Sequence, residues 1–268
     1  MKKLIHEIEQ LLKLLKLKVC LSNFRTLAER CEKDKLTHLE FILELFTQEC
    51  EVREQRRIEK LIKEAKLPRN KLLIDFNITR IPGLVPSQIQ HLAEGEFIDR
   101  CANILIFGNP GTGKSHLSIA LAREWCLLGR KIRFFTAANL VQMLLKAKAE
   151  LRLSQLIKRL DRFDVLIIDD ISYVTCARAE ADVLFTLLAE RYEMRSLVIT
   201  SNLPFSKWDS IFKDKMTTTA AIDRLVHHSS ILELNAPSYR TEQARKNIII
   251  GEKAKISDKK KEENMTKV

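Results

Sequence analysis

The sequence predicts an α/β protein with a parallel sheet flanked by helices, preceded by a small all-helical domain. Residues 103–234 alternate short apolar runs with helical stretches, which is typical of a parallel sheet with helices on both faces. Residues 1–67 contain no glycine, and their apolar side chains recur at helical spacing. The chain has 268 residues, enough for one sizeable core and a small accessory unit at about 100–200 residues per domain.

The N-terminal domain is assigned to residues 1–70 and is predicted to hold roughly three or four helices. Thr37 and Glu40 form a capping-box pattern before an apolar run, because the threonine hydroxyl accepts from the first turn while the glutamate reaches back. After Pro68, residues 69–100 are predicted to be a connector with turn residues at 81–83 and 85–87.

The core domain is assigned to residues 71–250. Strands are predicted at 103–107, 132–135, 165–168, 197–200 and 231–234. Helices are predicted at 115–128, where Gly129 ends the helix, and at about 138–149, 153–160 and 178–193. Residues 251–268 are rich in lysine and glutamate and have few apolar side chains, so a disordered tail is predicted there.

The composition favours a globular protein of the cytoplasm. Hydrophobic residues make up 46% of the chain, which argues against disorder of the chain as a whole. The six cysteines form no Cys-x-x-Cys pair and no metal-spaced cluster, so they are interpreted as reduced and mostly buried thiols. No apolar stretch approaches the roughly 18 residues of a membrane span, and the N-terminus lacks the apolar core of a signal peptide. We therefore expect no membrane partner.

The chain is basic, with a net charge of +11, and the excess is unevenly distributed. Residues 130–162 carry nine basic and two acidic side chains, and residues 1–71 carry 17 basic and 12 acidic ones. A basic balance indicates nucleic acid or an anionic surface as a partner, although a solvated lysine-rich exterior is equally common. The position of the charge has to decide between these two interpretations.

Residues 108–115, here called the phosphate loop, read Gly-Asn-Pro-Gly-Thr-Gly-Lys-Ser and match the pattern G-x-x-x-x-G-K-[ST]. Glycines let the backbone turn tightly, so that successive N–H groups point inward at a helix N-terminus and cradle a phosphate. Lys114 is expected to reach the β- and γ-phosphates of ATP, and the Ser115 hydroxyl to bind Mg²⁺. The predicted nucleotide-binding residues are Gly108, Asn109, Pro110, Gly111, Thr112, Gly113, Lys114, Ser115 and His116.

Two carboxylates follow the predicted strand at 165–168. Asp169 and Asp170 stand at its carboxyl end, which is where ligands bind in open α/β sheets. Asp169 is expected to bind Mg²⁺ through water, and Asp170 to polarise the water that attacks the γ-phosphate. An apolar run that ends in two aspartates is ordinarily no more than a strand end, and the phosphate loop upstream is what favours the functional interpretation.

Together these residues resemble the AAA+ ATPases, in particular the branch of helicase loaders and transposition helpers represented by DnaC and IstB. The similar phrases are Gly-Lys-Ser-His-Leu at 113–117, Ile-Asp-Asp-Ile-Ser-Tyr at 168–173, Thr-Ser-Asn at 200–202, Asp-Arg-Leu-Val-His-His-Ser at 223–229 and Ser-Tyr-Arg at 238–240. The N-terminal residues that are more similar to IstB than to DnaC are 36–41, Glu49, Arg53, Arg56, Arg57 and Leu67–Pro68. The resemblance covers most of the chain and implies a P-loop AAA+ core.

The resemblance implies three further site residues. Asn202 matches the polar sensor at the end of the strand between the two phosphate-binding strands, and would help to position the attacking water. Arg224 matches the arginine finger that a neighbouring subunit inserts, and Arg240 matches the second sensor, an arginine that reads the γ-phosphate. By itself the sequence would assign Arg224 only a surface charge on an amphipathic helix.

The chain departs from the AAA+ pattern at two places. Asp170 stands where glutamate is common, and its shorter side chain implies slow hydrolysis or a long-lived ATP state. Only 28 residues follow Arg240, which is too few for the usual helical lid domain, so a truncated lid is predicted. His227 and His228 lie in a family phrase, but no cysteine or carboxylate stands beside them at metal-ligand spacing, and the sequence gives them no role.

In initiator and loader relatives a helical insertion near residues 130–162 lines the inner face of an oligomer, where DNA is gripped. The candidates by position are Lys146, Lys148, Arg152, Lys158 and Arg159, which would contact the phosphates of double-stranded DNA without sequence preference. No aromatic side chains interleave with them, which favours duplex contact over capture of a single strand. The alternative is a solvated helix face.

The resemblance implies an ATPase that assembles on DNA and presents target DNA to a partner transposase, with ATP joining the subunits through Arg224. Two alternatives stay open: a replicative helicase loader with the same core, and a nucleotide-dependent DNA scaffold with little turnover. The N-terminal helices would bind a neighbouring subunit, the transposase or DNA.

Overall fold

The computed structural model describes residues 2–68, 71–173, 178–212 and 214–242. The chain divides into two compact units, Met1–Leu61 and Ile62–Val268. The predicted tail at 251–268 lies outside the described residues, as do the residues after 242 that bear on the truncated lid. The domain boundary after residue 70 stays a prediction.

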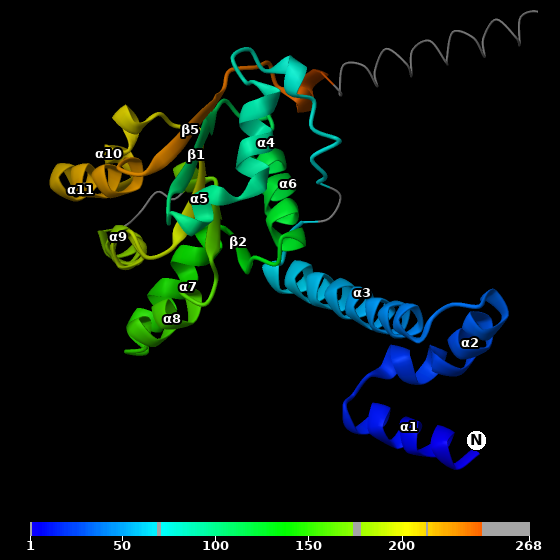
Figure 1. The fold of residues 1–268 in the computed structure, drawn as a ribbon. Helices are drawn as coiled ribbons and strands as arrows, with labels where there is room; N and C mark the ends of the chain where they lie inside the picture. Colours follow the sequence, from blue (N-terminus) through cyan, green and yellow to red (C-terminus); the bar gives the residue numbers. More distant parts are fainter. Residues whose placement is uncertain (1, 69–70, 174–177, 213, 243–268) are drawn as a thin grey trace, which may run out of the picture. The chain divides into compact units, whose positions relative to one another are not determined.

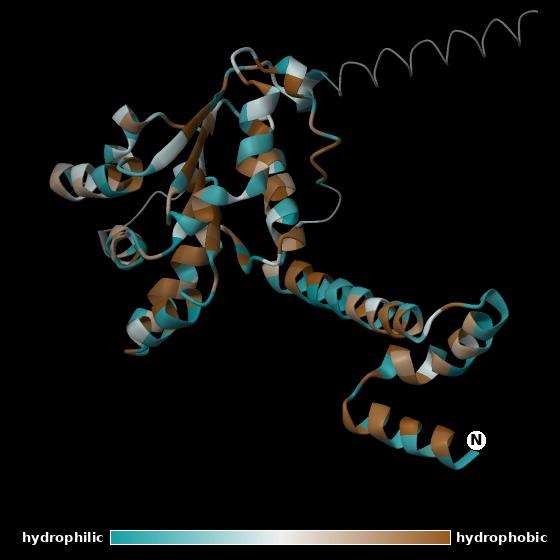
Figure 2. Ribbon diagram, viewed as in Figure 1, coloured by the Kyte–Doolittle hydropathy of each residue, from teal (hydrophilic) through white to brown (hydrophobic). Residues whose placement is uncertain are grey.

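The first unit is helical. It contains α1 (Lys2–Leu14), α2 (Lys18–Asp34) and most of α3 (His38–Ala65). Hydrophobic and hydrophilic residues both occur along these helices (Figure 2), and the hydrophobic ones recur at helical spacing. The core of this unit is formed by Leu12, Cys20, Phe24, Leu27, Cys31 and Leu45.

Polar side chains hold the helix ends of this unit. The predicted capping box is confirmed, because Glu40 N–H donates to Thr37 Oγ1 at 3.3 Å while the Glu40 carboxylate accepts from Thr37 N–H at 2.7 Å. The Glu49 carboxylate on α3 caps the N-terminus of α2. It accepts hydrogen bonds from the N–H groups of Val19 at 2.8 Å and Cys20 at 3.1 Å. Burial opposes its ionisation, yet these bonds and one from Arg53 bring the pKa of Glu49 below its ordinary value.

The second unit is built on a five-stranded parallel sheet with the order β2-β3-β4-β1-β5. The strands are β1 (Asn103–Gly108), β2 (Ile132–Thr136), β3 (Val165–Asp169), β4 (Ser196–Ser201) and β5 (Ser229–Leu234). The predicted fold class is therefore confirmed. Because β4 lies between β1 and β3, the carboxyl ends of these three strands meet at one edge of the sheet.

Helices cover both faces of the sheet (Figure 1). They are α6 (Lys114–Leu127), α7 (Ala137–Ala149), α8 (Leu153–Leu160), α9 (Arg178–Arg191), α10 (Asp209–Phe212) and α11 (Lys215–Val226). Leu105, Leu166 and Ile199 project from the strands into one cluster with side chains of α7 to α11. The alternate positions, such as Ile104 and Ile167, are equally buried and point to the opposite face, where α6 packs.

The connector prediction for residues 69–100 is wrong in part. This stretch holds a short 3-10 helix (Ile78–Arg80) and two helices, α4 (Pro86–Glu94) and α5 (Glu96–Asp99). Pro86 occupies the first position of α4, where its missing N–H and fixed φ are favourable, so the residue that suggested a turn begins a helix. α4 then packs against α6, and the Trp125 indole donates to the Leu92 carbonyl at 2.8 Å.

Arg191 connects the end of α9 to the sheet through hydrogen bonds of its side chain. Its side chain is fully buried, and it donates to the carbonyl oxygens of Leu160, Phe163 and Ser196 at 3.1 to 3.2 Å. Burial lowers the pKa of Arg191 to about 10, although the Asp161 carboxylate beside it acts in the opposite direction. The bonds join the end of α9 to the segments before β3 and at β4.

Most of the described thiols are shielded. Cys20, Cys31 and Cys126 are buried, whereas Cys50 is exposed and Cys101 is intermediate; Cys176 lies outside the described residues. Burial raises the pKa of Cys126 to about 11, which keeps that thiol protonated. Among the helices of the described chain, none has the length and apolar character needed to span a membrane.

Candidate nucleotide-binding site

The phosphate loop connects the end of β1 to the first turn of α6 (Figure 1). Gly108, Gly111 and Gly113 have φ values of +152°, +82° and +106°, a region that L side chains rarely adopt. A Cβ on Gly108 would lie 2.6 Å from the Leu234 carbonyl oxygen, and one on Gly113 would lie 3.0 Å from the ring of Phe76. The tight turn that exposes inward-pointing N–H groups therefore requires glycine at these positions.

Lys114 is held inside this loop, with only 6% of its surface exposed. Its ammonium donates to the carbonyl oxygens of Gly108 at 2.7 Å and Asn109 at 2.9 Å, and to Asn202 Oδ1. Burial lowers the pKa of Lys114, while the charges of Asp170 and Asp169 act to raise it. A cation that is desolvated in this way is stabilised by an arriving anion, as a phosphate would be.

The two aspartates at the end of β3 have different surroundings. Thr200 of β4 donates to Asp169 Oδ1 at 2.7 Å and accepts the Asp170 N–H at 2.8 Å. Asp170 has a left-handed backbone, with φ +63°, which is uncommon for a residue other than glycine. Burial raises the pKa of the Asp170 carboxyl, and the neighbouring Asp169 charge adds to this, while the hydrogen bond from Ser172 opposes it.

Asn202 connects Lys114 to the Asp170 carboxylate through hydrogen bonds. Its Oδ1 accepts from Lys114, and its Nδ2 donates to Asp170 Oδ1 at 2.7 Å. Ser172 supports both partners, because its hydroxyl donates to Asp170 at 3.0 Å and accepts the Asn202 N–H at 3.0 Å. The structure thus brings three residues singled out in the sequence into one network: Lys114 at the start of α6, and Asp170 and Asn202 directly after β3 and β4.

Sequence reasoning missed Thr200 and Ser172 as parts of this network. Both lie inside the phrases that resemble the AAA+ family, and each stands two residues away from a residue that was singled out, Asn202 for Thr200 and Asp170 for Ser172. That short spacing was the available signal. It is not specific, because a hydroxyl near a strand end ordinarily bonds to nearby backbone.

The segment after β5 crosses the phosphate loop. Tyr239 N–H donates to the Gly111 carbonyl at 2.9 Å, and a Cβ on Gly111 would overlap Ser238 Oγ. Arg80 holds this segment from the other side, with Glu242 at 2.6 Å and the Tyr239 ring below its guanidinium. Arg240 is exposed, and its charge contributes to lowering the pKa of Lys114, which places it in the electrostatic range of the loop.

His116 lies at the opposite side of the loop and packs outward. Its Nε2 is 3.0 Å from the Leu72 carbonyl oxygen, and its ring is 5.6 Å from that of Phe76. Its partners therefore belong to the segment before α4, and the nucleotide-binding role of His116 stays a prediction. These contacts indicate that the His116 imidazole helps to hold that segment beside the phosphate loop.

Arg224 is not brought to the Lys114–Asp170 network. It lies on α11, donates to the Ala220 carbonyl at 3.2 Å, and covers the ring of Phe185 with its guanidinium carbon 5.2 Å from the ring centroid. In the described part of the chain its contacts are thus with α11 and α9. The role of Arg224 as a finger supplied by a neighbouring subunit stays a prediction.

The five basic candidates lie on α7, at the start of α8 and along α8, and all five are exposed. Two of them have acidic neighbours, since Lys148 is 4.0 Å from Asp182 and Arg152 is 3.9 Å from Glu150. Such exposed pairs are weak. Leu151 lies in the turn between α7 and α8. Its side chain is 94% exposed, its φ is +56°, and the sequence analysis did not single it out.

The residues of the site fit a nucleotide with a magnesium ion. The glycine-lined turn has no room for a Cβ at Gly108 or Gly111, and Lys114 supplies a buried cation at its centre. The Ser115 hydroxyl and the Asp169 carboxylate supply the hard oxygen ligands that Mg²⁺ prefers.

Comparisons with known proteins show the family of the chain. A family model described as "IstB-like ATP binding protein" matches residues 10–247. Two relatives bear the names of insertion-sequence ATP-binding proteins. The one from Sinorhizobium fredii is 42% identical over 81% of this chain and 73% of its own length. The one from insertion sequence IS21 of Pseudomonas aeruginosa is 38% identical over 90% of this chain and 91% of its own length.

Among solved structures, the crystal structure of DnaI has a TM-score of 0.54 and 20% sequence identity, and it covers 68% of this chain and 98% of that chain. At that identity the likeness shows the fold alone, a parallel sheet flanked by helices. The family match spans both the helical unit and the phosphate loop, and the relatives align over most of their own length. The chain therefore belongs to the IstB-like family of ATP-binding proteins, which is associated with insertion sequences.

Proposed function

We propose that this protein is an ATP-hydrolysing regulator of transposition that assembles on double-stranded DNA and presents target DNA to a partner transposase. The observation that carries the hydrolytic part is the network of Lys114, Asn202 and Asp170 at the carboxyl ends of three neighbouring strands. The family association with insertion sequences supports the transposition part.

In the proposed reaction, the backbone N–H groups of the phosphate loop hold the β-phosphate and Lys114 neutralises charge on the β- and γ-phosphates. Asp170 orients a water molecule and accepts its proton as the water oxygen bonds to the γ-phosphorus. The bond from that phosphorus to the β–γ bridging oxygen breaks, and ADP leaves. Ser115 and Asp169 would hold Mg²⁺, which screens the phosphate charges when it is bound.

Asn202 has two tasks in this proposal. It keeps Asp170 turned toward the γ-phosphate position through its Nδ2, and its Oδ1 releases Lys114 when a phosphate replaces it as the partner of the ammonium. Arg240 would approach the same phosphate from the segment that crosses the loop, because Tyr239 ties that segment to Gly111.

Asp170 provides the test of turnover. We expect the Asp170→Asn variant to bind ATP but to release phosphate at least about 100-fold more slowly, because the amide cannot accept the proton. Burial raises the pKa of this carboxyl, so the wild-type rate is expected to fall on acidification at a higher pH than an ordinary aspartate would give. The measurements are DNA-stimulated phosphate release over a pH series and nucleotide binding.

The Asp170→Asn variant also distinguishes an ATP-hydrolysing enzyme from a nucleotide-dependent scaffold. If the wild type and Asp170→Asn are equally inactive while both bind ATP, the protein is a nucleotide-dependent DNA scaffold and the hydrolytic proposal fails. The Asp170→Glu variant is the matched partner, since it keeps the charge and restores the longer side chain. It is expected to retain hydrolysis.

DNA binding is assigned to the exposed basic residues of α7 and α8. Replacing Lys146, Lys148 and Arg152 with glutamate is expected to weaken duplex binding in the ATP state and to reduce the slope of log affinity against log salt by about three, since each lost phosphate contact releases about one counterion fewer. Fluorescence anisotropy with duplexes of unrelated sequence measures both effects.

The control for DNA binding has the same change of charge elsewhere on the second unit. Arg100, Arg195 and Lys207 are exposed, and replacing them with glutamate should leave most of the affinity intact. Equal loss in both triple variants would indicate that only net charge matters. Unchanged binding in the α7–α8 variant would refute the assigned surface.

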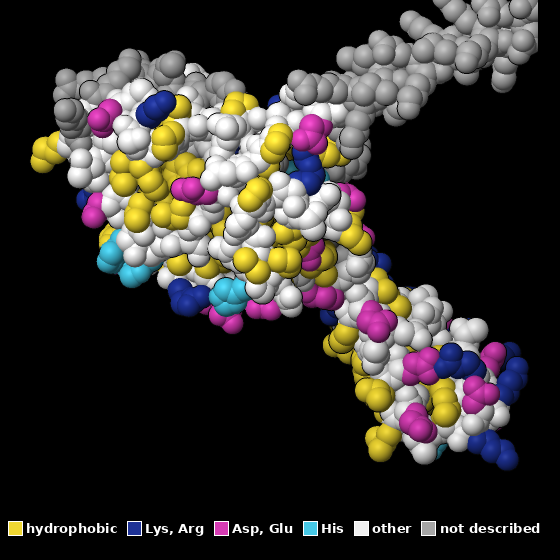
Figure 3. Space-filling model, turned by 90° about the horizontal axis from the view of Figure 1, so that it is seen from above, with side chains coloured by type: hydrophobic (Ala, Val, Ile, Leu, Met, Phe, Trp, Pro, Cys, Tyr) yellow, Lys and Arg dark blue, Asp and Glu magenta, His cyan; other side chains and the backbone are white. Residues whose placement is uncertain are grey.

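The N-terminal unit is proposed to bind a protein partner. Leu11, Leu14 and Leu39 are 57%, 76% and 79% exposed, and Figure 3 shows hydrophobic side chains among charged ones on the surface of this unit. Exposed apolar side chains of this size favour contact with another protein over contact with DNA. Capture of the transposase of the same insertion sequence through residues 1–61 would support the helper, whereas capture of a replicative helicase would support a loader.

A further inference from the structure

Two imidazoles and a carboxylate come together at the edge of the sheet opposite the nucleotide site. Glu193 lies in the turn between α9 and β4, and His227 and His228 lie between α11 and β5. Because β1, β4 and β5 are parallel, these turns stand at the amino ends of the strands, whereas Asp170 and Asn202 follow carboxyl ends. The cluster is therefore separate from the predicted Mg²⁺ site.

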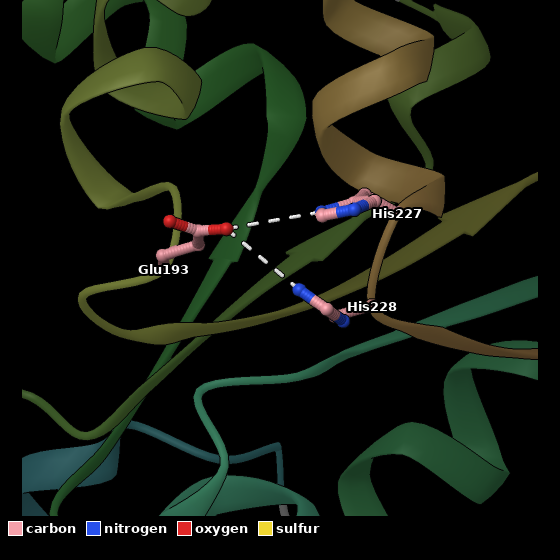
Figure 4. A group of neighbouring side chains, drawn as sticks. All are labelled: Glu193, His227 and His228. Carbon is pink, nitrogen blue, oxygen red and sulfur yellow. Dashed lines mark ion pairs between the residues drawn. The ribbon is translucent and has the colours of Figure 1, made fainter.

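The three side chains converge on one point (Figure 4). Glu193 Oε1 is 3.8 Å from His227 Nδ1 and 3.7 Å from His228 Nε2, and the three possible ligand atoms all lie within 4.8 Å of one another. Ligands about 2.1 Å from a tetrahedral Zn²⁺ are about 3.4 Å apart. Small side-chain rotations would bring the group to that spacing, and the exposed position leaves room for water as a further ligand.

We propose that Glu193, His227 and His228 form a binding site for a divalent transition metal ion such as Zn²⁺. Two imidazole nitrogens with one carboxylate oxygen are ligands that Zn²⁺ accepts, whereas Mg²⁺ and Ca²⁺ require oxygen ligands almost throughout. The sequence did not reveal the site because its carboxylate is more than thirty residues away from the histidines along the chain.

The backbone around the cluster is already held in place by Asn103, which is buried at the start of β1. Its Oδ1 accepts the Leu197 N–H at 2.9 Å, its Nδ2 donates to the Leu225 carbonyl at 3.2 Å, and its N–H donates to the His228 carbonyl at 2.7 Å. These bonds connect the strand that follows Glu193 to the segment that carries the histidines. A site whose backbone is fixed before the ion arrives loses little conformational freedom on binding.

Tyr192 lies next to the ligands, with its hydroxyl oxygen 2.8 Å from His227 Nδ1. This contact occupies the Nδ1 atom that would bind the ion, and the same hydroxyl interacts with Glu193. The hydroxyl therefore has to turn away from His227 when the ion binds.

A metal ion at this position would cross-link the start of β4 to the end of α11. Arg224 stands three residues before His227 on that helix, so the ion would restrain the helix that carries the proposed finger. This consequence rests on the proposed function. The binding site itself does not, and it is tested without nucleotide or DNA.

The test is metal binding by the full chain after treatment with a chelator and dialysis. We expect one Zn²⁺ per chain by titration calorimetry, a higher thermal unfolding midpoint with Zn²⁺, and a Co²⁺ spectrum of a site with nitrogen and oxygen ligands. His228→Ala and Glu193→Gln should each lower the affinity at least about 10-fold, in line with the loss of an interaction essential to a metal site.

The matched control is the other described group of this type, His91 with Glu94 and Glu96, which is also exposed but has a single imidazole. His91→Ala should bind Zn²⁺ as the wild type does. The proposal fails if the wild type binds no Zn²⁺, if His228→Ala and Glu193→Gln bind it unchanged, or if the Co²⁺ spectrum shows thiolate ligation. Unaltered ATP binding in both ligand variants establishes that their loss of metal is local.

Discussion

Replacing Lys114 with alanine is expected to lower the affinity for ATP by about 10³-fold, since the ammonium supplies charge-assisted hydrogen bonds to two phosphates at about 1.5–3 kcal/mol each. The fold should survive, because the side chain enters the loop and not the core, and its burial as a cation is unfavourable, as the lowered pKa of Lys114 indicates. Titration calorimetry with ATP measures the affinity, and circular dichroism reports on the fold.

A lysine outside the loop serves as the control for this prediction. Lys131 is exposed at the start of β2, and Lys131→Ala should bind ATP as the wild type does. The Lys114→Ala variant should also lose nucleotide-dependent DNA binding, since assembly is proposed to require ATP. ATP affinity close to that of the wild type in Lys114→Ala would refute the assignment of the phosphate loop.

Replacing Arg224 with alanine is expected to reduce assembly-stimulated hydrolysis by about 10³-fold or more, the range found for arginine fingers, while ATP binding stays close to normal. The physical reason is that the guanidinium lies over Phe185, away from the Lys114–Asp170 network of its own subunit. We therefore expect its charge to act on a γ-phosphate that is bound by a neighbouring subunit. Phosphate release as a function of protein concentration measures the effect.

Mixing variants tests whether the finger acts between subunits. Lys114→Ala subunits keep Arg224, and Arg224→Ala subunits keep an intact nucleotide site, so a mixture should regain part of the activity that neither has alone. Arg195→Ala removes an exposed arginine paired with Asp164 and is the control for lost charge. A mixture without regained activity, or wild-type hydrolysis independent of protein concentration, would contradict a finger supplied in trans.

The phosphate loop and the strand at 165–168 could be predicted because each is a local pattern. Glycines at fixed spacing and an apolar run that ends in two aspartates each span a few consecutive residues. Such residues largely determine the backbone geometry of their own segment. The connector could not be predicted in the same way. Pro86 is compatible with a turn and with the first position of a helix, and the packing of α4 on α6 is what decides between them.

The protonation of site residues also depends on contacts that are distant in the chain. Asp170 and Lys114 have shifted pKa values chiefly because the surrounding chain buries them, and Asn202 lies between them only because β4 is placed between β1 and β3. A single sequence contains the side chains but not the strand order, since that order minimises the free energy of the whole sheet and its helices.

The sequence by itself therefore determined the class of fold, the nucleotide-binding loop and the family resemblance, all of which rest on contiguous patterns. Only the tertiary structure decided that Thr200 and Ser172 support the aspartates, that Arg224 stands away from its own site, and that Glu193 meets His227 and His228. The physical reason is that hydrogen-bond partners and ligand sets are chosen by distance in space. Parallel strands bring together turns that are far apart in the chain.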